Sequence, residues 1–86
     1  MIFNNKRSES EILAQLLLSA TNEVKKTHLL YSSNISYSNF IKYFNFLLEK
    51  QFIEIKAGNP VGKVYLITKK GEIFLNHINN VLEHVK

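Results

Sequence analysis

A run of hydrogen-bonding side chains with helical spacing lies near the middle of the sequence. The run consists of Ser36, Tyr37, Ser38, Asn39, Lys42 and Asn45. Hydroxyl, amide and ammonium groups of this kind bond to base edges and phosphate oxygens. On a helix, Ser38, Lys42 and Asn45 fall on the side opposite the apolar Phe40 and Phe44. The spacing is typical of a polar helix face that contacts nucleic acid, and an ordinary solvated face is the alternative.

Lysines elsewhere in the chain could extend such a face. The remaining candidate contacts are Lys25, Lys26, Thr27, Lys56, Asn59 and Lys63. The chain carries 11 Lys and Arg against 7 Asp and Glu, a formal net charge of +4. A basic face attracts phosphates and makes binding sensitive to salt. The excess is modest, so a surface of ordinary solvated lysines explains the charge about equally well.

Residue patterns that indicate catalysis or metal binding are missing from the sequence. It has no cysteine, and its histidines are His28, His77 and His84. His77 and His84 are seven residues apart, whereas a helical metal pair needs a spacing of four. The glycines at 58 and 62 lie within an expected hairpin and not between a strand and a helix, so they do not form a nucleotide loop. We expect neither an enzyme nor a protein with a metal ion or cofactor.

The first half of the chain predicts three helices. Ser8 and Glu11 have capping-box spacing, which favours a first helix over about residues 8–20. Thr27 is the expected N-cap of a second helix, which ends at Asn34. The buried side of that helix is expected to consist of Leu29, Leu30 and Tyr31. Ser36 is expected mainly to cap a third helix that runs to about residue 50.

The short segment at Asn34, Ile35 and Ser36 has the length of the turn in a helix-turn-helix, with Ile35 pointing into the core. Residues 52–56 alternate like a half-buried strand, residues 57–62 form a turn, and residues 63–67 return as a second strand. Thr68 then caps a C-terminal helix over 69–86. We therefore predict one domain, residues 1–86, of the α+β class and mainly helical. Its fold is a winged helix-turn-helix with three helices, a two-stranded wing and the C-terminal helix.

The C-terminal helix is strongly amphipathic, and its apolar residues recur at four- and three-residue intervals. They predict a dimer interface that consists of Phe74, Ile78, Val81, Leu82 and Val85. Coverage of the domain's own core is the alternative explanation. Phe46 lies close to the polar side of the third helix, so it is either partly exposed or part of a partner surface.

The order and spacing of several segments resemble the small archaeal winged helix-turn-helix DNA-binding proteins, including the ten-kilodalton archaeal chromatin-protein type. The matching segments are 11–13, 26–27, 34–37, 43–50, 52–53, 65–71 and 74–75. The resemblance implies binding to double-stranded DNA and dimerisation through the C-terminal helix. The sequence has no apolar run of about 20 residues, the length that spans a bilayer, and residues 1–10 lack the apolar core of a signal peptide, so we expect a location in the cytoplasm, at the nucleoid, and no association with a membrane.

Two functions follow from these patterns. The first is a DNA-binding protein, either a transcription regulator or a nucleoid component, which contacts duplex DNA with the third helix and the wing. The second is a winged-helix module that binds proteins and not DNA, because a fold does not fix a function. Alanine substitution of Lys42 and Asn45 separates the two functions.

Overall fold

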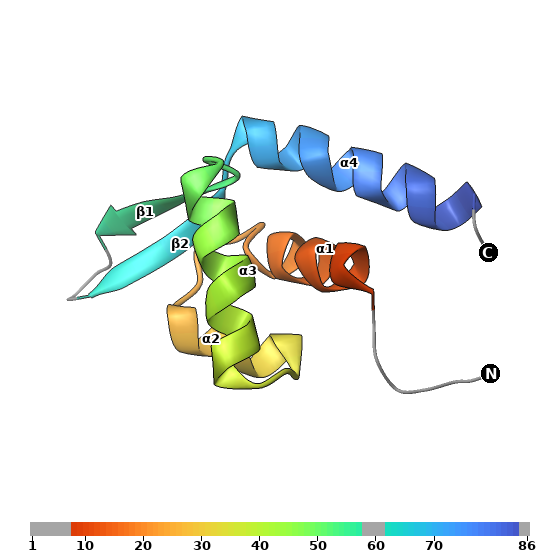
Figure 1. Cartoon of the computed structure of the whole chain (residues 1–86). Coiled ribbons are helices and arrows are strands. Elements are labelled where there is room, and N and C mark those ends of the chain that lie inside the picture. The colour runs from red at the N-terminus through yellow and green to blue at the C-terminus, as the bar shows by residue number, and fades with distance from the viewer. Residues whose placement is uncertain (1–7, 58–61, 85–86) are drawn as a thin grey trace.

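A computed structural model describes residues 8–57 and 62–84, which form four helices and one two-stranded antiparallel sheet. The elements are α1 (Glu9–Ser19), α2 (Lys26–Ser33), α3 (Tyr37–Glu49), β1 (Ile53–Ala57), β2 (Lys63–Ile67) and α4 (Lys69–His84). In Figure 1, α3 crosses the centre, the β-hairpin projects to one side, and α4 extends to the other side along α1. The predicted winged helix architecture is confirmed.

Local caps set the start of α1 as the sequence predicts. The Ser8 hydroxyl accepts a hydrogen bond from the Glu11 amide at 3.2 Å, and the Ser8 amide donates to the Glu11 carboxylate at 2.9 Å. The two bonds satisfy two amides that a helix start would otherwise leave unpaired. Downstream, Ile12, Leu16 and Leu17 place their side chains in the core.

The turn between α2 and α3 has the predicted form. Asn34 adopts a left-handed conformation (φ 56°, ψ 37°), and the Ser36 hydroxyl accepts from the Asn39 amide at 3.3 Å. Ile35 is half-buried against the core. The prediction that Tyr31 lies on the buried side of α2 is wrong, because 78% of its surface is exposed. Tyr31 follows Leu29 by two residues, about 200° around the helix, and therefore points away from the core.

The end of α3 depends on a left-handed backbone conformation at a position where the sequence has no glycine. Gln51 has a positive φ of 62°, although left-handed backbone favours glycine. The Gln51 amide donates to the Leu48 carbonyl at 3.0 Å, and the Phe52 amide donates to the Leu47 carbonyl at 2.9 Å. These two bonds make a Schellman motif, which satisfies carbonyls at the helix end and turns the chain into β1.

The wing pairs β1 with β2 from Ile53–Ile67 to Ala57–Lys63. Val24, in the link between α1 and α2, pairs with Tyr65 on the other side of β2. Within the described residues β1 has a neighbour on one side only. The wing projects away from the helices (Figure 1), so the expected alternation along β1 is wrong beyond Ile53, and Ile55 is 49% exposed.

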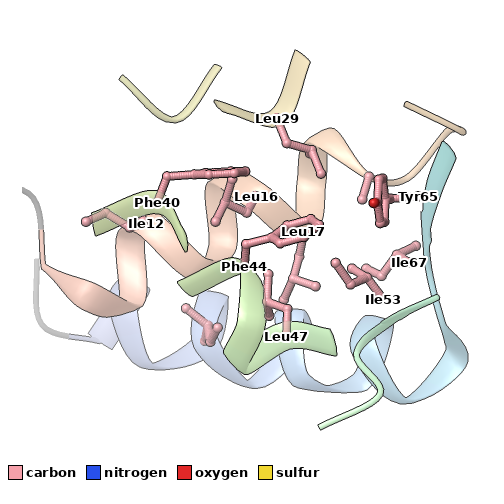
Figure 2. Packing of buried hydrophobic residues seen from close by; sticks show 12 residues of the cluster. Ile12, Leu16, Leu17, Leu29, Phe40, Phe44, Leu47, Ile53, Tyr65 and Ile67 are labelled. Atoms are coloured by element: carbon pink, nitrogen blue, oxygen red, sulfur yellow. The ribbon is translucent and has the colours of Figure 1, made fainter. Parts of the chain in front are cut away.

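The core lies where the four helices meet the two strands. Figure 2 shows side chains from α1, α2 and α3 converging on Ile53, Tyr65 and Ile67. The Phe44 ring is in stacked contact with Phe40 at 5.3 Å between ring centroids and meets the edge of Tyr65 at 5.0 Å. Aromatic contacts of this geometry add to the free energy gained by burying apolar surface.

Helix α4 begins at the predicted cap and packs along α1. The Thr68 hydroxyl accepts from the Gly71 amide at 2.9 Å and donates to the Gln51 carbonyl at 2.7 Å, which ties the start of α4 to the end of α3. Ile78 is buried in the core. None of the helices in the described part of the chain has the length and apolar character needed to cross a membrane.

Candidate nucleic-acid interface

The outer face of α3 presents the predicted polar residues to solvent. Ser38, Lys42 and Asn45 are exposed, whereas Phe40 and Phe44 face the core. The apolar side thus fixes the rotation of the helix, and this rotation decides which polar groups point outward. The structure brings these three predicted contacts together along one side of α3.

The N-terminal turn of α3 is open as well. Tyr37 is 59% exposed, so most of its surface does not cover the core edge. Asn39 is also exposed. Its backbone amide donates to the Ser36 hydroxyl, whereas its side-chain amide takes no part in this bond. The Ser36 hydroxyl is the cap, which leaves it less available to an external ligand than Tyr37 or Asn39.

The start of α2 differs from the prediction. Lys25 and not Thr27 holds the N-cap position, with extended backbone (φ −83°, ψ 156°) and no side-chain cap, and α2 begins at Lys26. The Val24–Tyr65 pairing fixes the chain as extended up to Lys25, so the helix begins at the next residue. Thr27 is exposed in the first turn, where its side chain remains accessible.

Lys26 is held more firmly than a surface lysine. Its ammonium nitrogen lies 5.0 Å from the centroid of the Phe44 ring, a cation–π contact. The side chain of Lys26 is half-buried, whereas Lys25 is exposed. Lys26 therefore links the start of α2 to α3, and Lys25 is the freer cation of the pair.

The wing contributes two exposed lysines, Lys56 on β1 and Lys63 on β2. The Lys56 ammonium lies 3.6 Å from a carboxylate oxygen of Glu23, and both side chains are about half exposed. An exposed pair of this kind contributes roughly 0–1 kcal/mol, so phosphate can compete with Glu23 for Lys56. The predicted contact at Asn59 lies outside the described residues.

The residues predicted to form a dimer interface divide into three groups. Ile78 is buried within the chain's own core, and Phe74 and Leu82 are half-buried against it. Val81 is 59% exposed, and Ile73 on the same helix is 51% exposed. Val85 lies outside the described residues. The self-packing alternative thus accounts for Ile78, whereas Val81 remains open to a partner.

Phe46 belongs to an aromatic cluster within the chain. Its ring centroid lies 6.1 Å from that of Phe52 and 6.4 Å from that of Phe74, and these two rings stack at 4.3 Å. Phe46 is accordingly half-buried. It also lines an open groove of about 420 Å³ between α1 and α3, together with Glu9, Leu13, Asn39, Lys42 and Tyr43.

Sequence reasoning missed one exposed aromatic residue beside the predicted interface. Tyr31 and Tyr37 border the same hollow of about 410 Å³ at the turn between α2 and α3. The helical period alone places Tyr31 opposite the buried Leu29, and this position could have identified Tyr31 as exposed. Among residues 8–57 and 62–84, no group of three His, Cys, Asp or Glu side chains is placed to hold a metal ion.

Comparison with known proteins places this geometry in context. The chain shares 28% identity and a TM-score of 0.77 with the crystal structure of Sso10a-2, a DNA-binding protein from Sulfolobus solfataricus, over 90% of this chain and 80% of that one. The resemblance to small archaeal winged helix proteins is thereby confirmed. SSV1 F-93 matches with 17% identity and a TM-score of 0.70, over 96% of each chain, which shows the shared fold.

A bacterial structure has the same fold. The DNA-binding TubR fragment from Clostridium botulinum matches with 24% identity and a TM-score of 0.61, over 91% of this chain and 99% of that one. The search of curated proteins found no match. The model of a family described as "Winged helix-turn-helix" matches residues 6–86, nearly the entire sequence. On this match and on its architecture, the chain belongs to the winged helix-turn-helix family.

Proposed function

We propose that this protein binds duplex DNA through α3 and the wing and acts as a transcription regulator or a nucleoid component in the cytoplasm. The main supporting observation is the outer face of α3, where Ser38, Lys42 and Asn45 are exposed together. In helix-turn-helix proteins the second helix of the motif enters the major groove and its N-terminal residues approach base edges. The similarity to Sso10a-2, a DNA-binding protein, supports the same assignment.

The lysines around α3 suit the phosphates that flank a groove. The N-terminal end of α2 and the wing lie on the same side of α3 in Figure 1, joined by the Val24–Tyr65 pairing. The Lys56–Glu23 ion pair and the Val24–Tyr65 pairing bring β1 and the segment before α2 together, so the lysines of the wing and of the start of α2 are not scattered over the surface. Each phosphate contact releases counterions, so the binding constant should fall steeply as salt is raised.

The test is fluorescence anisotropy with a labelled duplex of mixed sequence at several salt concentrations. Lys42→Ala should weaken binding and reduce the slope of log K against log salt by about 1. Lys69→Ala is the matched control, because this exposed lysine is the first residue of α4 and lies on neither α3 nor the wing. Its salt slope should equal that of the unmodified protein.

Two results would overturn the proposal. Absence of binding even at low salt would exclude DNA as the ligand. Equal losses from Lys42→Ala and Lys69→Ala would show attraction to the overall charge and not docking through α3. In either case the winged-helix protein-interaction module becomes the better hypothesis, with the exposed Ile73 and Val81 of α4 as its contact surface.

We also propose that the protein is a homodimer that associates through the exposed side of α4. Val81 lies there, and the half-buried Phe74 precedes it by two helical turns. Two modest DNA-binding surfaces that act on one duplex bind more tightly than either surface alone. A dimer would offset the weak positive charge of α3, which has a single lysine and no arginine.

A further inference from the structure

Asn45 has the position and freedom needed to contact a base. It follows Lys42 by three residues and Ser38 by seven, and all three are exposed on the side of α3 away from the core. Asn34 differs, because it holds the left-handed turn between α2 and α3. Asn45 lies inside α3, and within the described part of the chain its side-chain amide makes no hydrogen bond.

The length of this polar stripe matches a short run of bases. Seven residues of helix span about 10 Å, at a rise of about 1.5 Å per residue. Base pairs are spaced about 3.4 Å apart, so the stripe covers roughly three of them. Glu49 lies one further turn along the same side and is exposed. Its negative charge disfavours contact with phosphates, which leaves the first three turns of α3 as the part that meets DNA.

The chemistry of the stripe distinguishes between bases. A carboxamide offers one acceptor and one donor, which match the N6 amino group and N7 of adenine. Guanine presents two acceptors there, N7 and O6, and its usual partner is arginine. Helix α3 contains no arginine, and Lys42 is its only cation. An ammonium group is a point charge that serves phosphates as readily as guanine.

We infer that Asn45 is a specificity-determining residue that reads adenine in the major groove, so that the protein prefers duplexes containing A·T pairs. This inference rests on the proposed function, because it requires α3 to enter the major groove. The wing is a weaker candidate for such a preference, since it lacks the arginine that minor-groove reading usually employs.

The test compares three repeating duplexes of equal length at one salt concentration. The first alternates adenine and thymine, the second replaces adenine by 7-deazaadenine, and the third alternates inosine and cytosine. The 7-deaza base lacks the N7 acceptor but keeps the minor groove unchanged. Inosine pairs resemble A·T in the minor groove and G·C in the major groove, so the third duplex separates the two grooves.

We expect the adenine–thymine duplex to bind about tenfold more tightly than either of the other two, the loss typical of one bidentate base contact. Asn45→Ala should abolish this difference. Asn79→Ala changes an exposed asparagine on α4, outside the proposed DNA-binding face, and should preserve the difference. The same preference in both variants would overturn the role of Asn45.

Two other outcomes would also overturn the inference. Equal affinity for all three duplexes would mean that the protein binds DNA without reading adenine in the major groove, and the proposed function would stand. Failure to bind any duplex at low salt would reject the proposed function itself.

Discussion

Gly71 lies where the backbones of two segments come close together. A Cβ atom at this position would collide with the Phe52 carbonyl oxygen and would lie 2.9 Å from a side-chain carbon of Ile67. The Phe52 carbonyl also accepts a hydrogen bond from the Thr68 amide at 3.0 Å, so it is held in place. The absence of a side chain at Gly71 therefore permits α4 to begin against the end of α3.

Gly71→Ala should destabilise the fold by about 1–2 kcal/mol. Alanine favours a helix over glycine by about 1 kcal/mol, but overpacking against fixed backbone costs about 1–3 kcal/mol or more. Urea unfolding measures the difference. Asn76→Ala, at an exposed position of the same helix, should leave the midpoint nearly unchanged. Equal stability of Gly71→Ala and the unmodified protein would show that the Phe52 segment can shift at little cost.

At the scale of elements, α4 has one side packed against the core and one side exposed. Ile78 is 7% exposed and packs in the core, whereas Val81, three residues later, is 59% exposed. The two side chains lie about 60° apart around the helix, since three residues turn the chain by about 300°. The boundary between the self-packed side and the open side of α4 thus runs between them.

Ile78→Ala and Val81→Ala should therefore have unequal effects on the free energy of unfolding. The first removes buried methyl and methylene groups and should cost about 2–5 kcal/mol. The second removes exposed groups and should change the monomer by less than about 0.5 kcal/mol. Thermal unfolding at low protein concentration compares them. Similar losses for both variants would mean that Val81 is covered, either by a partner or by residues outside the described part.

At the scale of the whole molecule, the question is whether two copies act together. A chain of 86 residues has a small core, and an exposed apolar side of α4 adds surface that association would bury. A dimer would place two α3 helices on one duplex. Half-sites about 34–36 Å apart, or a multiple of this distance, would then be expected.

Val81→Asp should convert a dimer into a monomer, because it places a charge in an apolar interface. Sedimentation equilibrium should show the change in mass, and the DNA affinity should fall as the second contact is lost. Asn79→Asp adds the same charge on another side of α4 and should leave the dimer intact. If the unmodified protein is monomeric at all concentrations, α4 is not a dimerisation helix.

Local rules in the sequence were sufficient for much of the fold. Ser8, Ser36 and Thr68 each cap a helix by accepting from an amide three residues on, so the caps could be predicted from spacing alone. Asn34 tolerates left-handed backbone for similarly local reasons. The polar identity of the outer face of α3 follows from the 3.6-residue period of a helix.

Contacts between distant residues decided the rest. The start of α2 depends on Val24 pairing with Tyr65, which lies 41 residues further along the chain. The left-handed Gln51 is held by hydrogen bonds around it, although no glycine marks the position. The sequence by itself determined which side chains could contact DNA. Only tertiary packing decided which of them point outward together, because each helix rotates to bury its own apolar side.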